Sequence, residues 1–472
     1  MGEGITISVV EKNTDLTVIG AGPGGYVAAI RAAQLGGKVV LVEKEEVGGV
    51  CLNKGCIPTK TLLRTTELLT LLGKAKDFGV NIDSWSVNFK KMLERKNQVV
   101  KRLVMGVKTL LKRNGVDLVY GSAQIVKSGE IKVLRNDGGK EVLRSRKIIV
   151  ATGSKPAKPP IPGVDTTGVL TSDEVFKLEV LPQSLLIVGG GPVGLEFAQI
   201  FSSLGVEVTV VEMLPHLLPN EDEEIGLMLH KIMEKNGVKV FVNTKVTKIG
   251  GEKDEKQVYL LGKSGEDIKK AEKVLLAVGR TPNIEGLGLD SIGVSFDKRG
   301  ISTNNKMETN VSGVYAIGDV AGKFLLAHTA SEEGVVAAEN ALGYERKINY
   351  RAVPRCVFTV PEVACVGLTE KQAREAGYNL KIGRFPFLAS GRALTMDETD
   401  GFIKVLVDGD TDEILGVHII GPLASELIPE AVLAINLEAT TKEIIDTIHA
   451  HPTLAEALKE AVLDAEKRAI HK

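Results

Sequence analysis

The chain has few cysteines, few aromatic residues and no excess of charge of either sign. Among 472 residues there are 4 Cys and 1 Trp, and the formal net charge is −1. Such a chain lacks the basic stripe that nucleic-acid binding requires. No apolar run approaches the roughly 18 residues of a membrane-spanning helix. With 25% charged and 43% hydrophobic residues, the composition is instead that of an ordinary soluble globular protein.

The first twenty residues, MGEGITISVVEKNTDLTVIG, also lack a recognisable targeting signal. They contain no basic region followed by an apolar core and a small-residue cleavage site, and they are not rich in Arg and Ser. We therefore expect a cytoplasmic protein, in which thiols stay reduced. The length of the chain predicts roughly three domains.

One pattern occurs twice along the chain. In its first copy, an apolar strand at residues 16–19 leads into Gly20-x-Gly22-x-x-Gly25, and after a helical segment a second strand ends at Glu43. A glycine motif alone is weak evidence. Strand, glycines, helix, strand and terminal acid at this spacing together predict a dinucleotide-binding unit.

The second copy follows the same order, with Gly189-x-Gly191-x-x-Gly194 and an acid at Glu212. In both copies the acid stands 23 positions after the first glycine, from 20 to 43 and from 189 to 212. The first glycine permits a tight turn, the second lets a pyrophosphate approach the helix N-terminus, and the third allows close helix–strand packing. The terminal acid binds a ribose hydroxyl. The chain is therefore predicted to hold two dinucleotides.

Two of the four cysteines stand close together in GGVCLNKGCIPTK, as Cys51 and Cys56. Cysteines at this spacing permit three interpretations: a zinc site, a pair of inert buried thiols, or a redox-active disulfide. A zinc site needs four ligands, and Cys356 and Cys365 would have to complete it from a strand-like segment at an unsuitable spacing.

A disulfide would require a distorted backbone between Cys51 and Cys56. In an ideal helix the Cα atoms of residues i and i+5 lie ~8.7 Å apart, whereas a disulfide needs roughly 4.4–6.8 Å. Gly55 and Pro58 are residues that allow such a distortion. A strained disulfide is easier to reduce, which suits catalysis.

The order of motifs from about Asp15 to the C-terminus resembles that of the pyridine nucleotide–disulfide oxidoreductases. The motifs are the first glycine motif with its acid, the cysteine pair, ATGS at 151–154, the second glycine motif with its acid, AVGR at 277–280, AIGD at 316–319 and HPT at 451–453. The resemblance implies an α/β fold, with two Rossmann-like dinucleotide-binding domains and a C-terminal α+β dimerisation domain.

The resemblance also implies domain boundaries. We expect an FAD-binding domain with the redox cysteine helix over 1–150, an NAD-binding domain over 151–280, a central domain that completes the FAD site over 281–348, and an interface domain over 349–472.

In that family the first fold binds FAD and the second a nicotinamide nucleotide, and the acid of AIGD, here Asp319, holds the ribityl chain. Glu212 would repel a 2′-phosphate, and no Arg or Lys follows it closely, so NAD is expected and NADP is not. The further residues that the resemblance places at FAD are Lys44, Gly49, Lys60, Ala123, Thr152, Gly153, Ser154, Leu326, Ala327 and His328. At NAD they are Glu196, Val246 and Gly279.

The resemblance assigns roles to the thiols as well. Cys51 becomes the thiol that exchanges with substrate, and Cys56 the thiol that faces the flavin. Lys60 is expected to pair with Glu196 beside the flavin and the nicotinamide. Lys54 and Thr59 stand where relatives more often have Val and Ser, and neither is expected to block the chemistry.

The segment HAHPTLAEALKEAVL supplies a candidate base. We expect a helix from Pro452, and because a residue before proline is pushed out of helical geometry, His451 should lie outside it and fold back to Glu456. A carboxylate there orients the ring and stabilises its charged form. An isolated His of this kind is often structural. The resemblance makes His451 the general base and Glu456 its orienting partner, while His449 is expected to be structural.

Within the family the chain most resembles the members that oxidise dihydrolipoamide with NAD. The second glycine unit lacks the arginines of NADP-linked reductases, and AVLDAEKRAIHK at the C-terminus contains no extra cysteine pair. The resemblance implies a homodimer in which His451 reaches the other subunit's disulfide. It also implies that the partners are the lipoyl domains of 2-oxo acid dehydrogenase complexes or a glycine cleavage carrier protein. No metal site is expected. Another NAD(H)-linked reductase of a small disulfide, or a non-enzymatic flavoprotein subunit, remain alternatives.

Overall fold

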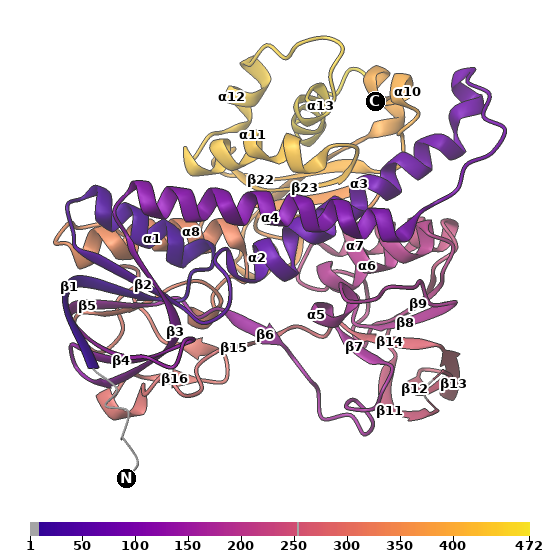
Figure 1. The fold of residues 1–472 in the computed structure, drawn as a ribbon. Helices are drawn as coiled ribbons and strands as arrows, with labels where there is room; N and C mark the ends of the chain where they lie inside the picture. The colour runs from indigo at the N-terminus through magenta and orange to yellow at the C-terminus, as the bar shows by residue number, and fades with distance from the viewer. Residues whose placement is uncertain (1–8, 253) are drawn as a thin grey trace. The chain divides into compact units, whose positions relative to one another are not determined.

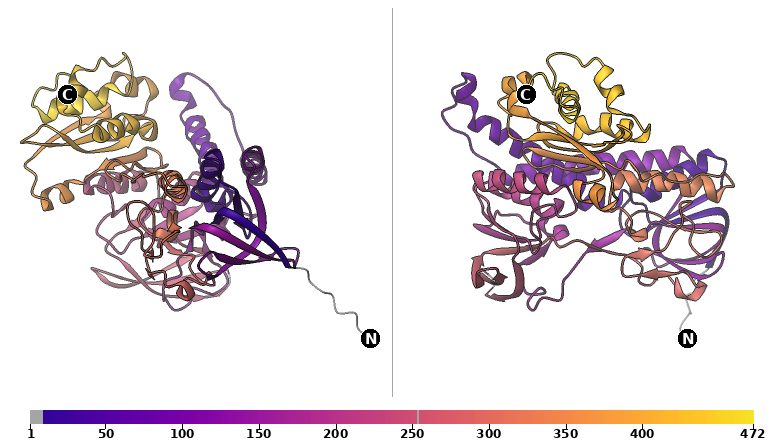
Figure 2. Two further views of the ribbon diagram at one scale, coloured as in Figure 1. Left: turned by 90° about the vertical axis from the view of Figure 1, so that its left-hand side faces the viewer. Right: turned by 180° about the vertical axis from the view of Figure 1, so that it is seen from behind.

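The computed structural model describes residues 9–252 and 254–472. Residues 1–8, where the segment examined for a targeting signal begins, lie outside it. The chain forms two compact units (Figures 1 and 2). Unit one comprises Met1–Thr61, Leu93–Ala157 and Arg280–Asn349, and unit two comprises Leu62–Met92, Lys158–Gly279 and Tyr350–Lys472.

Unit one is built on a sheet with a parallel centre. The strands are β1 (Val9–Ile19), β2 (Val39–Glu43), β3 (Asp117–Lys127), β4 (Glu130–Arg135), β5 (Lys140–Val150) and β18 (Val314–Ala316). β1 runs parallel to β2 and β5, whereas β4 pairs antiparallel with β3 and β5. Helices α1 (Pro23–Gln34) and α8 (Ala327–Ala341) lie side by side (Figure 1). The first predicted strand is therefore present as β1, and it is longer than the apolar run at residues 16–19 from which it was predicted.

Unit two begins with a fully parallel sheet in the order β10-β9-β8-β14-β7. Its strands are β7 (Val169–Thr171), β8 (Ser184–Val188), β9 (Glu207–Val211), β10 (Lys239–Phe241) and β14 (Lys273–Leu276), and its helices are α6 (Pro192–Ser203) and α7 (Glu223–Lys235). An antiparallel sheet of β11 (Lys245–Gly251), β12 (Lys256–Gly262) and β13 (Gly265–Ala271) follows. The second glycine motif therefore also lies in a doubly wound fold.

The rest of unit two is an antiparallel sheet covered by helices. The strands are β19 (Arg355–Val357), β20 (Glu362–Gly367), β21 (Leu380–Pro386), β22 (Phe402–Asp408) and β23 (Ile414–Gly421). Helices α11 (Ala424–Asn436) and α13 (Glu456–Ala465), yellow in Figures 1 and 2, pack on the orange strands. Their contact buries an apolar core that includes Ile403, Val405, Ile428 and Val462. The architecture confirms the predicted α/β class, with two Rossmann-like folds and a C-terminal α+β domain.

The remaining elements connect these layers. They are α2 (Gly49–Lys54), α3 (Cys56–Gly73), α4 (Phe89–Arg113), α5 (Ser172–Val175), α9 (Glu370–Glu375), α10 (Gly391–Met396), α12 (Thr441–Asp446), β6 (Ser154–Pro156), β15 (Arg280–Pro282), β16 (Phe296–Asp297), β17 (Gly300–Ile301) and the 3-10 helices η1 (Ala75–Phe78), η2 (Asp290–Ile292), η3 (Gly318–Ala321) and η4 (Phe387–Ala389).

β22 and β23 form an antiparallel hairpin whose connection is longer than a two-residue turn. β22 ends at Asp408 and β23 begins at Ile414. The Asp408 carboxylate accepts hydrogen bonds from the backbone of Asp410 and the hydroxyl of Thr411, at 3.2 and 2.7 Å. These side-chain bonds stabilise a loop between the strands in place of a two-residue turn.

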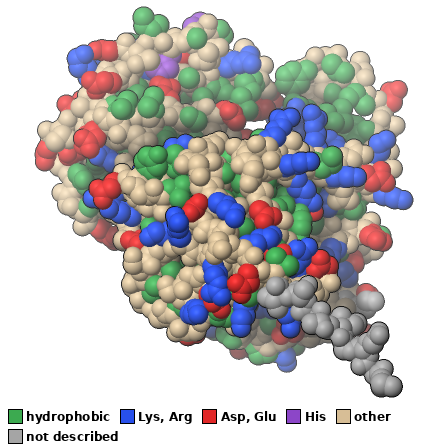
Figure 3. Space-filling view, turned by 60° about the vertical axis from the view of Figure 1, so that its left-hand side comes forward, with side chains coloured by type: hydrophobic (Ala, Val, Ile, Leu, Met, Phe, Trp, Pro, Cys, Tyr) green, Lys and Arg blue, Asp and Glu red, His purple; other side chains and the backbone are tan. Residues whose placement is uncertain are grey.

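The surface agrees with the near-neutral composition. On the face drawn in Figure 3, Lys and Arg side chains lie among Asp and Glu side chains. Within residues 9–252 and 254–472, no helix combines the length and the apolar character needed to cross a bilayer.

A buried lysine joins three carboxylates inside unit two. Lys404 Nζ lies 2.9 Å from Asp222, 2.7 Å from Glu224 and 2.7 Å from Glu370. The side chains of Lys404 and Asp222 are 1% and 2% exposed. The hydrogen bond from Arg384, with the contact from Lys404, lowers the pKa of Glu224 to about 2. The cluster connects the start of α7 to the C-terminal sheet, because its members come from both.

Lys404→Met should destabilise unit two strongly, because it leaves the buried Asp222 carboxylate without a countercharge. Removing one partner of a buried ion pair costs about 3 to 5 kcal/mol, so the midpoint of thermal unfolding should fall clearly. Lys442→Met is the matched control, since Lys442 pairs with Asp446 on the surface at 75% exposure. An unchanged midpoint in Lys404→Met would contradict the role given to the cluster.

Candidate active site and dinucleotide sites

The three glycines of the first motif differ in their surroundings. Gly20 has φ +101°, and a Cβ there would lie 2.3 Å from the carbonyl oxygen of Ala151. A Cβ at Gly25 would lie 1.8 Å from the carbonyl oxygen of Gly20. At Gly22 the nearest atom would be 3.9 Å away. The first glycine therefore serves the turn and the third serves close packing, while the second leaves room for a ligand at the N-terminus of α1.

The second motif repeats this arrangement in unit two. Gly189 has φ +114°, and a Cβ there would meet the carbonyl oxygen of Ala277 at 2.4 Å. A Cβ at Gly194 would lie 2.2 Å from the carbonyl oxygen of Gly189, whereas one at Gly191 would have no neighbour within 4 Å. Both motifs thus present an open backbone at the end of a helix.

The two terminal acids also behave alike. Glu43 accepts hydrogen bonds from the backbone N–H groups of Ala21 and Glu45, at 2.7 and 2.8 Å. Glu212 does the same with Gly190 and Leu214, at 2.7 and 2.8 Å. Burial raises the pKa of Glu43 above its usual range. Each carboxylate is held against its glycine turn, where the fold places a ribose, so the residues fit one dinucleotide in each unit.

A third cluster in unit one surrounds Asp319. Its carboxylate accepts a hydrogen bond from the hydroxyl of Ser154, and Arg280 Nε donates to the same hydroxyl at 2.6 Å. Two residues predicted at FAD, Ser154 and Asp319, are thus brought together. Arg280 was not predicted as a site residue, although AVGR, which it ends, was one of the motifs. Thr152, another predicted residue, is held by Asn283 through bonds of 2.7 and 3.0 Å.

Cys51 and Cys56 lie on two successive helices of unit one. α2 ends at Lys54, Gly55 adopts φ −142° and ψ −110°, and α3 begins with Cys56. The backbone is therefore interrupted at the glycine that the sequence suggested. Both cysteines are half-buried thiols in this structure.

The two thiols interact directly. A hydrogen bond to Cys56 raises the pKa of the Cys51 thiol, burial raises it further, and Lys60 acts in the opposite direction. Tyr26 on α1 is also near Cys51, and burial raises the pKa of its hydroxyl. Sequence reasoning missed Tyr26, although it directly follows the first glycine motif.

The predicted base and its partner meet in unit two. His451 Nδ1 lies 2.9 Å from Glu456 Oε1, and the backbone N–H of Thr453 donates to Glu456 Oε2 at 2.8 Å. Burial acts to raise the pKa of Glu456, but these two contacts outweigh it and the pKa is lowered. The ring is 81% exposed. The bond to Glu456 leaves Nε2 as the ring atom that can accept a proton.

The expected helix start was wrong by four residues. α13 begins at Glu456, not at Pro452. The Glu456 carboxylate binds the loop before the helix, through His451 and Thr453, so this segment stays irregular. The prediction that His451 lies outside the helix does not depend on this difference.

Other predicted residues are divided between the units. Cys51, Cys56 and Lys60 belong to unit one, whereas Glu196 and His451 belong to unit two. Glu196 is buried in α6 and accepts the backbone N–H of Phe358 at 3.1 Å. The Lys60–Glu196 pair and the approach of His451 to the thiols therefore stay predictions. Most of the other predicted cofactor residues lie in unit one: Lys44 after β2, Gly49 in α2, Ala123 in β3, Gly153 before β6, and Leu326, Ala327 and His328 at the start of α8. The other two lie in unit two, Val246 in β11 and Gly279 after β14.

Within residues 9–252 and 254–472, no group of three or more His, Cys, Asp or Glu side chains is arranged to hold a metal ion. Cys356 and Cys365 lie on the paired strands β19 and β20, opposite Ala364 and Arg355.

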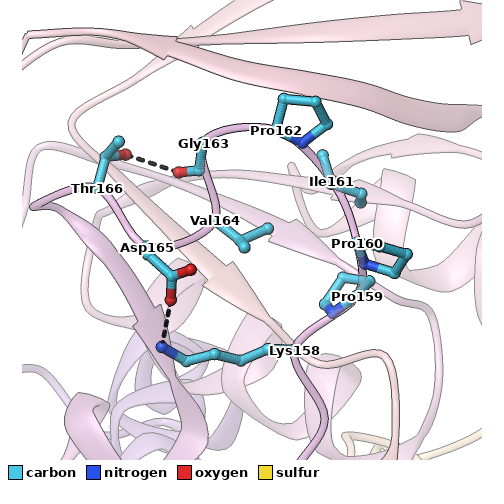
Figure 4. Close-up of a pocket in the computed structure, with 9 residues that line it drawn as sticks. All are labelled: Lys158, Pro159, Pro160, Ile161, Pro162, Gly163, Val164, Asp165 and Thr166. Atoms are coloured by element: carbon cyan, nitrogen blue, oxygen red, sulfur yellow. Dashed lines mark hydrogen bonds and ion pairs between the residues drawn. The ribbon is translucent and has the colours of Figure 1, made fainter.

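A surface pocket lies in unit two. It is lined by the single loop from Lys158 to Thr166 (Figure 4), in which Lys158 pairs with Asp165 at 2.7 Å. Three prolines stiffen this connection between β6 and β7. None of the predicted site residues lines the pocket.

Comparison with known proteins agrees with these motifs. Residues 14–334 match the model of the pyridine nucleotide-disulphide oxidoreductases, and residues 353–462 match the dimerisation domain of the same proteins. The chain belongs to the pyridine nucleotide-disulphide oxidoreductase family.

Relatives in this family are similar over their full length. A dihydrolipoyl dehydrogenase of Bacillus subtilis is 45% identical over 468 residues, with 97% of this chain and 99% of the relative covered. One from Thermus scotoductus is 48% identical over 468 residues, with 98% and 99% covered.

Solved structures are also similar to this chain in fold. LpdA from Mycobacterium tuberculosis has a TM-score of 0.88 at 28% identity, covering 96% of this chain and 99% of its own. The HOCl-induced flavoprotein disulfide reductase RclA from Escherichia coli has a TM-score of 0.84 at 29% identity, covering 95% and 99%. Both likenesses extend over the two units.

Gly191→Ala should leave the fold intact and weaken the second dinucleotide site. The added methyl group meets no protein atom within 4 Å, but it occupies the space through which a pyrophosphate approaches. KM for the nicotinamide nucleotide should rise at least ~10-fold, which corresponds to about 1.4 kcal/mol, with the thermal midpoint unchanged. Gly194→Ala is the contrast, since its methyl group would collide with backbone and lower stability. Unchanged KM in Gly191→Ala would show that the nucleotide binds elsewhere.

Proposed function

We propose that this chain is an NAD-dependent dihydrolipoyl dehydrogenase. The observation that carries the proposal is the combination of two complete dinucleotide units, a thiol pair across an interrupted helix and a His–Glu dyad in one chain. The full-length likeness to dihydrolipoyl dehydrogenases at 45% and 48% identity supports the choice of substrate.

The two dinucleotides are FAD in unit one and NAD in unit two. Glu43, Ser154 and Asp319 would hold FAD, with Gly22 leaving room for its pyrophosphate. Glu212 and Gly191 would hold NAD in the same way. FAD, when bound, takes two electrons from the thiol pair and supplies a hydride for NAD⁺.

The thiol exchange is performed by side chains of the protein. His451 Nε2 takes the proton of one substrate thiol, and the thiolate attacks Cys51 Sγ of the oxidised pair. The Cys51–Cys56 bond breaks and Cys56 leaves as a thiolate. The second substrate thiol then attacks the substrate sulfur of the mixed disulfide, the bond from that sulfur to Cys51 breaks, and Cys51 leaves and takes up the proton of the attacking thiol. Lipoyl disulfide is released, and the Cys51–Cys56 pair holds the two electrons.

The contact between the two thiols fits an exchange between them. The hydrogen bond to Cys56 raises the pKa of the Cys51 thiol, and Lys60 acts in the opposite direction. Paired with Glu196, Lys60 would stabilise a thiolate of the pair.

The dimerisation domain of the family suggests a homodimer, in which His451 of one chain would serve the thiols of the other. We propose as partners the lipoyl domains of 2-oxo acid dehydrogenase complexes or a glycine cleavage carrier protein, and a cytoplasmic location.

The test is steady-state turnover of the purified flavoprotein with dihydrolipoamide and NAD⁺. Small disulfides with NADH provide the comparison, because the likeness to RclA makes a disulfide reductase the second candidate. A higher kcat/KM for a small disulfide than for either lipoamide form would favour that second candidate.

NAD⁺ should be preferred over NADP⁺ by at least ~10²-fold in kcat/KM, or about 2.7 kcal/mol. The reason is that the buried Glu212 carboxylate accepts ribose hydroxyls but repels a 2′-phosphate. Equal use of both nucleotides would contradict the role given to Glu212.

Substitutions of the two cysteines should give different spectra. In Cys51→Ser, Cys56 is left as a thiolate beside FAD, and a long-wavelength absorption band should appear without reductant. Cys56→Ser should show no such band. Both variants should lose dihydrolipoamide oxidation and keep NADH oxidation by an artificial acceptor. A band in Cys56→Ser alone would reverse the two roles.

A further inference from the structure

A second His–carboxylate pair lies two residues before His451. His449 Nε2 is 2.8 Å from Glu430 Oε1 on α11, and Nδ1 is 3.2 Å from the carbonyl oxygen of Thr447. The His449 side chain is 6% exposed, compared with 81% for His451. The His449 ring is therefore enclosed by the protein, whereas the His451 ring is open to solvent in the single chain.

This loop, residues 447–455 between α12 and α13, has no regular secondary structure. Ile448, next to His449, is 94% exposed in the single chain, so it does not anchor the loop within its own subunit. Lys459 on α13 donates to the carbonyl oxygen of Thr447 at 2.9 Å, and Glu456 binds Thr453. These contacts join the loop to α13. The His449–Glu430 bond joins it to a different helix, α11, and so fixes it from a second direction.

The chemistry of the contacts defines what His449 supplies. A carboxylate and a carbonyl oxygen only accept hydrogen bonds. A hydrogen on Nε2 of His449 forms the bond to the Glu430 carboxylate. A hydrogen on Nδ1 would form the bond to the carbonyl oxygen of Thr447. An amide side chain that reaches Glu430 can supply the first of these bonds, whereas a methyl group can supply neither.

We propose that His449 is a positioning residue for His451, acting through the loop that both share. The inference rests on the proposed function, in which His451 removes the proton of a substrate thiol. With His449 held by Glu430, the backbone up to Thr453 is fixed and His451 meets Glu456 in the bonded geometry. Without that bond the loop gains freedom, and proton removal slows while steps that need no base continue.

The test compares His449→Ala, His449→Gln and Glu430→Ala in the flavin-loaded full chain. His471→Ala is the matched control, because His471 Nδ1 also lies 2.8 Å from a glutamate, Glu460, but at the exposed C-terminus. Each variant is assayed for dihydrolipoamide oxidation and, in the same preparation, for NADH oxidation by an artificial acceptor.

His449→Ala and Glu430→Ala should each lower kcat for dihydrolipoamide at least ~10-fold, with KM for NAD⁺ and the artificial-acceptor rate within about twofold. Because the two residues act as a unit, the double variant should be no worse than either single one. His449→Gln should recover part of the loss, and His471→Ala should match the unsubstituted protein. Equal loss of both activities, or no loss, would overturn the proposal.

Hydrogen exchange of the loop gives a readout that is independent of the reaction. The Thr453 amide, bonded to Glu456, should exchange at least ~10 times faster in His449→Ala, because local opening becomes more frequent. Unchanged exchange would overturn the proposal. If the unsubstituted protein does not oxidise dihydrolipoamide but exchange still rises in His449→Ala, the proposed function fails and the positioning role stands. Should His449→Ala not fold, Glu430→Ala and His449→Gln give the same comparison.

Discussion

The close contact between a helix and the strand before it, at Gly25 and at Gly194, is the constraint on which both nucleotide units depend. A single methyl group at these positions would lie 1.8 or 2.2 Å from a backbone oxygen. Because no side chain separates them, the helix N-terminus lies directly at the end of its strand, and the second glycine stays open in front of it. Glu43 and Glu212 then bond to the backbone of the turn from the neighbouring strand. In both units, backbone packing thus shapes the candidate nucleotide site, and the surrounding side chains add hydrogen bonds to it.

The other candidate functional groups lie in separate segments of the chain, and each is positioned by its own local contacts. The break at Gly55 brings two thiols into hydrogen-bond contact, which a continuous helix would prevent. The loop before α13 presents an exposed imidazole whose Nδ1 is bonded to the Glu456 carboxylate. Asp222, which caps α7, also binds the buried Lys404 of the C-terminal sheet. Within unit two, the segment that contains α7 is thereby connected to the C-terminal antiparallel sheet through one lysine and its carboxylate partners.

Sequence reasoning succeeded where a function depends on local spacing. The glycine motifs, the distorted turn at Gly55 and the His451–Glu456 contact all involve residues close in the chain, so their spacing carries the geometry. The start of α13 was misplaced because side-chain bonds to Glu456, and not the proline, decide where that helix begins. Arg280 contacts Ser154 across 126 positions, and Lys404 contacts Asp222 across 182. No local pattern marks such partners, so they emerge only from the folded chain, as do Tyr26 beside Cys51 and Glu430 beside His449.

The central claim is that substrate thiols deliver electrons to NAD⁺ through the Cys51–Cys56 pair and FAD. The most direct measurement is the visible spectrum of the purified protein during anaerobic titration, first with dihydrolipoamide and then with NAD⁺. We expect a flavin spectrum that acquires long-wavelength absorbance as the thiol pair is reduced and returns to its initial form as NADH appears. A protein that binds no flavin, or a flavin spectrum that dihydrolipoamide leaves unchanged, would contradict it.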